Sequence, residues 1–169
     1  MFWSPAICAA VCRTYSAPWR PVAFAPGVLA STGLESAEIV RGIAQASGAG
    51  TLIAVDALAA CEEKRLCCTV QLADTGIVPG SGIGNTRTAF DQRTMGVPVI
   101  AVGVPTVISA GTLRGDPSQA GLIVTPSDID ARIAHMARIL AAGINRALFP
   151  HLSEAEIASS CRTVTNFLC

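Results

Sequence analysis

Two apolar runs, separated by glycine-rich sequence, constrain the fold of this chain more than any other feature. Residues 51–55 read T-L-I-A-V and residues 97–104 read V-P-V-I-A-V-G-V. Both runs have the length of strands and the near-continuous hydrophobicity of strands that are buried on both faces. Such strands belong to parallel sheets with helices packed on them. The fold class predicted from these runs is therefore α/β with a mostly parallel sheet.

Periodic apolar residues predict two long helices beside these strands. The first covers residues 31–48, with Ser31 or Thr32 as its cap and Gly48 at its end. A short strand is predicted at 20–28. Together with the strand at 51–55, this strand and helix predict a right-handed βαβ unit. The second helix lies within residues 122–148, with Thr125 as cap, Pro126 in the first position and the acid of a capping box at Asp128.

The remaining segments give shorter predictions. Residues 57–63 are expected to form a short helix or loop, residues 66–73 a strand, and residues 74–85 irregular structure because glycine and proline interrupt them. Residues 109–121 are expected to be a flexible surface loop. A last short helix is expected to begin at Ser153, with Glu156 completing a capping box.

The composition fits one globular domain and excludes several kinds of partner. The 169 residues are 51% hydrophobic and 14% charged, which argues against disorder. The 12 basic residues balance the 12 acidic ones, so no basic surface for nucleic acid or for an anionic membrane is predicted. No apolar run approaches the roughly 20 residues that a membrane-spanning helix needs.

No cofactor or metal site is predicted. The seven cysteines are odd in number and irregular in spacing, which favours reduced thiols over disulfides or a zinc site, and there are two histidines. The glycine-rich residues 76–84 lack the lysine of a nucleotide-binding P-loop, and their spacing also differs from the dinucleotide-binding pattern.

Two aspartates are the candidate catalytic residues. Asp56 follows the apolar strand at 51–55, where an open α/β sheet places its ligand crevice. A partly desolvated carboxylate there would have a raised pKa and suit acid–base chemistry, but the same position suits an aspartate that caps the following turn. Asp74 begins a D-T-G triplet that pepsin-like proteases also carry, but one triplet is a weak signal and an Asx turn is the simpler interpretation.

The other common catalytic groups are less well supported. His135 lies on the second predicted helix and His151 follows a proline, and neither has an aspartate or cysteine at catalytic spacing. No serine stands in a G-x-S-x-G elbow, so a serine hydrolase triad is not indicated.

Three segments together resemble one known family. They are V-D-A-L-A at residues 55–59, T-V-Q-L-A-D-T-G-I-V-P-G-S-G-I-G-N at 69–85 and G-V-P-V-I-A-V-G-V-P-T-V at 96–107. In this order they closely resemble the germination protease of spore-forming bacteria. The resemblance covers about residues 20–150. It divides the chain into an unmatched segment, 1–19, and a germination-protease-like domain, 20–169.

The resemblance implies both a fold and an activity. The fold would be a three-layer α/β sandwich related to hydrogenase maturation proteases. The activity would be that of an endopeptidase that degrades small acid-soluble spore proteins when germination begins. Its location would be cytoplasmic, in the spore core. By the same resemblance, germination proteases are implied to be made as inactive precursors that process themselves and to assemble as tetramers. Its proposed catalytic pair is two aspartates, and Asp56 matches the second of them.

The first aspartate of that pair has no counterpart here, because no aspartate precedes Asp56. Three hypotheses follow. The chain is an N-terminally incomplete germination protease whose activity is lost or impaired. Alternatively, it is an active protease in which Asp74 replaces the missing carboxylate. The third hypothesis is a non-enzymatic binding or assembly module on the same scaffold.

Overall fold

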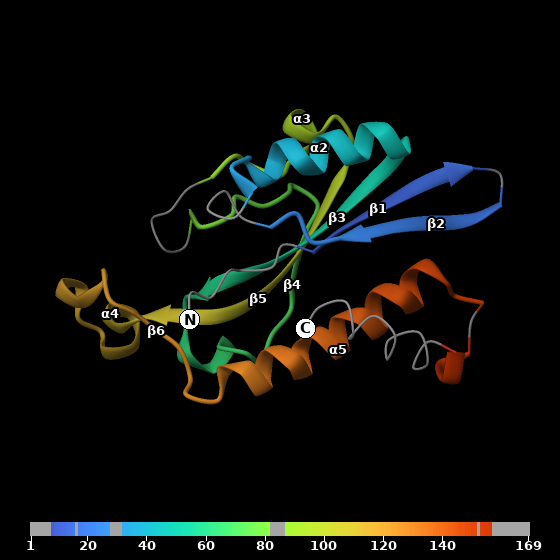
Figure 1. The fold of residues 1–169 in the computed structure, drawn as a ribbon. Helices are drawn as coiled ribbons and strands as arrows, with labels where there is room; N and C mark the ends of the chain where they lie inside the picture. Colours follow the sequence, from blue (N-terminus) through green and yellow to red (C-terminus); the bar gives the residue numbers. More distant parts are fainter. Residues whose placement is uncertain (1–7, 16, 28–31, 82–86, 152, 157–169) are drawn as a thin grey trace. The chain divides into compact units, whose positions relative to one another are not determined.

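The computed structural model describes residues 8–15, 17–27, 32–81, 87–151 and 153–156, with the backbone alone for residues 8–20 (Figure 1). The chain divides into two compact units, Met1–Pro126 and Ser127–Cys169. The first unit contains the sheet and the second contains the longest helix. In the described part, no helix is long and apolar enough to cross a membrane.

The first unit is built on a mixed sheet of six strands, in the order β2-β1-β3-β5-β4 with β6 also paired to β5. Only the pairing of β3 with β5 is parallel, and the others are antiparallel. The predicted α/β class is confirmed, and the sheet contains more antiparallel pairs than the sequence suggested. The strands are β1 (Cys8–Tyr15), β2 (Ala17–Phe24), β3 (Ala49–Ala60), β4 (Gln71–Ala73), β5 (Val99–Ser109) and β6 (Ile123–Val124).

The expected crossover between parallel strands is present, with another strand inserted. Because β1 is antiparallel to both β2 and β3, the latter two run in the same direction, and α2 (Ser36–Ser47) connects them. The helix ends at Gly48 and β3 begins at the next residue, so helix and strand run in opposite directions. The start of α2 therefore lies at the end of the unit toward which β3 runs.

The hydrophobic core of this unit lies between α2 and the sheet. Val40 of α2 and Leu52 of β3 are fully buried in it. Truncating a side chain such as Leu52 to alanine typically costs about 2–5 kcal/mol, so this core fixes α2 on the sheet. The buried members of the cluster are Ala37, Val40, Ala44, Ala49, Leu52, Ala54, Phe90, Met95 and Val99. Two of them, Phe90 and Met95, come from the segment of α3 (Gln92–Met95), whose contacts with α2 complete the layer.

Three predicted segments differ in the structure. Residues 57–60 continue β3 instead of leaving it as a helix or loop, because β5 extends to Ser109 and pairs with this part of β3. Of the strand predicted at 66–73, only Gln71–Ala73 is a strand, and the preceding residues form turns after the 3₁₀ helix η1 (Glu63–Arg65). The helix predicted from residue 31 begins at Ser36.

Residues 109–121 form regular structure rather than the flexible loop predicted for them. The helix α4 (Ala110–Arg114) is capped by the side chain of Ser109, which accepts a hydrogen bond from the Thr112 N–H at 3.0 Å. The 3₁₀ helix η3 (Pro117–Gln119) is capped by Asp116, which accepts from the Ser118 N–H at 3.0 Å. Side-chain caps at both starts hold this short segment in place.

The second unit contains α5 (Ile129–Leu148). The predicted cap was wrong: the helix starts at Ile129, and Thr125 instead donates its hydroxyl hydrogen to the carbonyl of Thr106 at 2.7 Å. Asp128 precedes α5 without capping it, because its carboxylate accepts from Nε of Arg132 at 2.8 Å. The capping box predicted at Ser153 is confirmed by the Ser153 N–H donating to Oε2 of Glu156 at 2.8 Å.

Candidate functional site

Asp56 is a buried acid within the longest strand of the sheet. Its side chain is 5% exposed, and among the described residues only Thr106 is another buried polar side chain. Strand alternation places Asp56 on the same face as Leu52 and Ala54, which pack in the α2 core. The strand continues four residues past it, so Asp56 does not cap a turn at the strand end. The structure leaves Asp56 as a carboxylate inside the sheet layer.

The surroundings of Asp56 favour its protonated form. Burial raises the pKa of Asp56 to about 6, and the Ala57 N–H, which donates to Oδ1 at 2.8 Å, opposes part of that shift. A carboxyl group with a pKa near 6 can give up and take back a proton close to neutral pH. This is the property that the sequence predicted for a partly desolvated acid at this position.

The neighbouring strand leaves room beside Asp56, and a leucine fills it. Asp56 is paired in register with Gly103 of β5, and Leu58 with Pro105. A Cβ atom added to Gly103 would overlap Cδ1 and Cγ of Leu58. Leu58 therefore packs directly over Gly103, on the face that carries Asp56.

Asp74 lies at a different place on the sheet and is exposed. It follows β4, whose last residue Ala73 is paired with Ala101, whereas Asp56 is level with Gly103. The two aspartates are two strands apart across the sheet, and Asp74 lies three residues beyond Gln71, the residue of β4 that is level with Asp56. Together these offsets give roughly 14 Å between the two Cα atoms. The reason is that β4 runs antiparallel to β5 and β3. The carboxyl end of β4, which Asp74 follows, therefore points away from the carboxyl end of β3. The structure does not bring the two candidate aspartates together.

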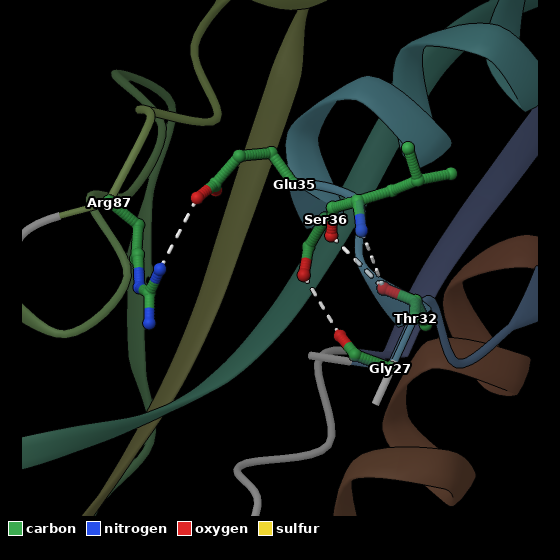
Figure 2. A network of polar contacts seen from close by, with 6 residues as sticks. Gly27, Thr32, Glu35, Ser36 and Arg87 are labelled. Atoms are coloured by element: carbon green, nitrogen blue, oxygen red, sulfur yellow. Dashed lines mark hydrogen bonds and ion pairs between the residues drawn. The ribbon is translucent and has the colours of Figure 1, made fainter. Parts of the chain in front are cut away.

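A polar network holds the start of α2 (Figure 2). This start lies at the end of the unit toward which β3, the strand of Asp56, runs. Arg87 donates from Nη1 to Oε1 of Glu35 at 3.3 Å, and both side chains are about one-third exposed. Next to it, the hydroxyl of Ser36 donates to the carbonyl of Gly27 at 2.8 Å. Thr32 forms a turn with Leu34 through hydrogen bonds of 3.0 and 3.2 Å. These contacts join the segment after β2, the helix and the segment before α3.

The Glu35–Arg87 pair was not predicted. The two residues lie 52 positions apart in the sequence, so no local spacing could reveal the pair. Because the carboxylate of Glu35 is paired with Arg87, this acid at the start of α2 attaches the segment before α3 to the helix. A partly exposed ion pair of this kind contributes about 0–1 kcal/mol to stability, so its main effect is to position the segments.

The glycine-rich segment is a closed loop at the edge of the core. Ile77 and Phe90 form two backbone hydrogen bonds, with N–O distances of 3.0 and 2.8 Å, and the Arg87 N–H donates to the Pro79 carbonyl at 3.1 Å. The irregular structure predicted for 74–85 is confirmed up to Ser81, and residues 82–86 lie outside the described part. The loop therefore begins and ends on the bridge between Ile77 and Phe90.

No metal centre is visible in the part of the chain that the structure describes, where no three His, Cys, Asp or Glu side chains come together in a group that could hold an ion. His135 is exposed on α5. The ring of His151 meets that of Phe149 edge-on, with centroids 6.2 Å apart.

Thr106 has a buried hydroxyl without a hydrogen-bond partner in the described structure. It is the extra residue of a β-bulge, since Leu58 pairs with Pro105 and Ala59 with Val107.

Replacing Thr106 by valine is expected to raise the free energy of unfolding by about 1 kcal/mol, because the shape is kept and an unsatisfied polar group is removed. Urea unfolding would measure this. Thr106→Ser is the control: it keeps the hydroxyl and loses a methyl group, so it should be destabilising. Equal destabilisation by both would contradict the expectation.

Comparison with known proteins identifies the family. A sequence model of the germination protease family matches residues 12–119. This chain belongs to the germination protease family. The predicted resemblance is thereby confirmed, and the germination protease of Clostridium acetobutylicum is 39% identical over 179 residues, covering 82% of this chain and 55% of that protein.

Two further germination proteases show the same extent of similarity. That of Caldanaerobacter subterraneus is 37% identical over 175 residues, covering 80% of this chain and 54% of the relative. That of Bacillus subtilis is 52% identical over 99 residues, covering 58% of this chain and 27% of the relative. The chain thus spans about half the length, or less, of these curated germination proteases.

Proposed function

We propose that this chain carries one half of a two-carboxylate endopeptidase site, with Asp56 as the catalytic group that it contributes. The observation that carries the proposal is the burial of Asp56, which raises its pKa to about 6. The family relationship supports a peptide bond as the target, and small acid-soluble spore proteins in the spore core as the substrates. A precursor form and a homo-oligomer, a tetramer by resemblance, belong to the same proposal.

A pair of carboxyl groups divides the work of hydrolysis. One is ionised and takes a proton from the attacking water, while the other is protonated and donates to the substrate. The raised pKa of Asp56 suits the protonated role at mildly acid pH and the basic role above it. The partner must lie within a few ångströms to share the water, as in other carboxylate pairs.

Neither Asp74 nor Glu35 suits the role of that partner. Asp74 is roughly 14 Å away by strand spacing. The carboxylate of Glu35 is paired with Arg87. We therefore propose that the 169-residue chain by itself cleaves slowly or not at all, and that activity needs a second carboxylate from outside this sequence.

The test is incubation of the recombinant chain with a purified small acid-soluble spore protein, followed by mass spectrometry of the fragments. We expect no fragments, or a rate far below that of a full-length germination protease under the same conditions. Fragments produced at a comparable rate would overturn the proposed impairment. If such cleavage were lost in Asp74→Asn as well as in Asp56→Asn, Asp74 would be the missing partner.

The role of Asp56 needs an active background. Mixing the chain with an N-terminal fragment of a germination protease that contains the first aspartate should restore cleavage, and Asp56→Asn should abolish it again. Asp130→Asn, which alters an exposed acid in the first turn of α5, is the matched control. Restored cleavage that survives Asp56→Asn would show that Asp56 is not catalytic. Binding of the spore protein without cleavage, even after complementation, would favour a binding module.

A further inference from the structure

Two polar side chains are buried among the described residues, and they lie on neighbouring parallel strands. Asp56 of β3 and Thr106 of β5 are each 5% exposed. Ile108 of β5 pairs with Ala60, and alternation along β3 places Ala60 on the same face as Asp56. Thr106 lies two residues before Ile108, so its side chain points to that face as well. The two buried polar groups therefore share one face of the sheet.

Both residues lie beyond the part of the sheet that the α2 core covers. Within β3 the buried cluster beneath α2 ends at Ala54, and Asp56 is the next residue on that face. Thr106 lies still further along, because the bulge falls between the row of Leu58 and the row of Ala59. In an open α/β sheet, ligands bind outside the carboxyl ends of the parallel strands. Thr106 is therefore on the side of Asp56 where a ligand is expected.

The side chain of Thr106 lacks the hydrogen bond that a buried hydroxyl normally has. Its carbonyl oxygen accepts the hydroxyl hydrogen of Thr125 at 2.7 Å, but its own hydroxyl has no partner in the described structure. Buried polar groups are nearly always paired, so an unpaired one needs an explanation, such as a ligand that is absent. Bulges next to active sites commonly re-aim one side chain, and Thr106 is the extra residue of a bulge. A hydroxyl can donate and accept, which suits the N–H or C=O of a peptide.

The separation of Thr106 from Asp56 matches a short length of extended peptide. The two strands are about 4.8 Å apart, and the offset along them adds about 7–10 Å, so the two Cα atoms are roughly 10 Å apart. An extended peptide covers this distance in about three residues. A peptide with its cleaved bond at Asp56 can therefore place a main-chain group at the hydroxyl of Thr106.

We propose that the hydroxyl of Thr106 hydrogen-bonds to the main chain of the protein substrate, about three residues from the bond that is cleaved. This inference rests on the proposed peptidase function, because the ligand is the segment that binds at Asp56. Asp56 and Thr106 are equally buried, so the substrate reaches both by displacing the groups that cover this face. Because the contact is to the main chain, Thr106 adds affinity without selecting a particular side chain.

The test measures binding without catalysis. The full chain carrying Asp56→Asn is titrated into fluorescein-labelled fifteen-residue peptides that cover a small acid-soluble spore protein, and anisotropy gives the Kd of the tightest peptide. Adding Thr106→Val should weaken this binding about tenfold, because one hydrogen bond is lost. Thr106→Ser keeps the hydroxyl and should stay within about twofold of the parent. Thr51→Val, the same change near the other end of β3, is the matched control and should leave the Kd unchanged.

Stability separates this role from a purely structural one. Thr106→Val is expected to be the more stable of the two variants and Thr106→Ser the less stable, because only the first removes the unsatisfied hydroxyl. An effect that acted through folding would therefore weaken binding in Thr106→Ser. An effect through the hydroxyl weakens it in Thr106→Val. Urea unfolding of the same samples measures the order of stability.

Ester substitutions in the peptide locate the contact. Replacing one peptide bond at a time by an ester removes an N–H and weakens the carbonyl acceptor. At one position the ester should weaken binding to the parent and to Thr106→Ser but not to Thr106→Val, which has already lost that hydrogen bond.

Four results would each overturn the proposal. They are no peptide binding by the parent, a Kd unaffected by Thr106→Val, equal weakening by Thr106→Val and Thr106→Ser, and no ester position that is coupled to Thr106. Because cleavage is not measured, these results do not depend on whether Asp56 is catalytic. Failure of the proposed catalytic role would appear in the complementation assay with peptide binding intact.

Discussion

Replacing Asp56 with asparagine is expected to stabilise the folded chain by about 3 kcal/mol near pH 7.5 and by about 0.5 kcal/mol near pH 4. Burial raises the pKa of Asp56 from 3.8 to about 6 in the folded state. Asparagine has the shape of the protonated acid, carries no charge at any of these pH values and keeps an oxygen for the Ala57 N–H. The variant therefore avoids the cost of burying a carboxylate.

The direction of the pH dependence follows from which state holds the proton. Between about pH 4 and pH 6 the folded chain keeps a proton on Asp56 that the unfolded chain has released, so the contribution of Asp56 to stability falls as the pH rises through this window. Well above pH 6, Asp56 is ionised in both the folded and the unfolded chain, so its contribution to stability no longer changes with pH. The stability difference between variant and wild type should therefore grow from pH 4 to about pH 6.5 and then become constant.

Urea unfolding of both proteins at several pH values measures this difference. Because the other acids are common to both chains, their titration cancels in the comparison. Asp74→Asn, at an exposed position, is the control and should differ from wild type by no more than about 0.5 kcal/mol at any pH. A difference between Asp56→Asn and wild type that does not change with pH would show that Asp56 is not desolvated in the folded chain.

The parts of the fold that the sequence predicted correctly are those with strong local signals. The strand predicted at 51–55 is part of β3, and residues 99–104 of the strand predicted at 97–104 are part of β5, because long apolar runs are buried wherever the chain forms a sheet. The end of β3 could not be predicted in the same way. Ala57 to Ala60 have little strand propensity, and pairing with the far end of β5 decides their conformation.

The candidate site was predictable only in part. Burial of Asp56 followed from the apolar strand around it. The position of Asp74 depended on the direction of β4, which nothing in residues 66–73 specifies, since parallel and antiparallel short strands look alike in sequence. The pairing of Glu35 with Arg87 depended on how α2 and the glycine-rich loop pack together. Contacts between distant segments are set by the assembled core, so single-sequence reasoning cannot reach them.

Replacing Gly76 with alanine is expected to lower the free energy of unfolding by about 3 kcal/mol or more. Gly76 has a φ of +88°, a conformation that costs other residues about 1–2 kcal/mol. An added Cβ would also overlap the carbonyl oxygen of Phe90 and lie 2.9 Å from Cα of Asp91. That carbonyl accepts the Ile77 N–H at the base of the glycine-rich loop, so the methyl group would push apart the bridge that closes the loop.

The matched control separates the two costs. Gly96 also has a positive φ, of +76°, but a Cβ there would meet nothing within 4 Å, so Gly96→Ala should cost only the conformational part, about 1–2 kcal/mol. Urea unfolding of both variants gives the comparison. If the two lost the same stability, the contact between Gly76 and Phe90 would not be tight. A larger loss for Gly76→Ala would show that the clash adds to the strain, because backbone atoms of the buried Phe90 cannot move aside as a flexible side chain can.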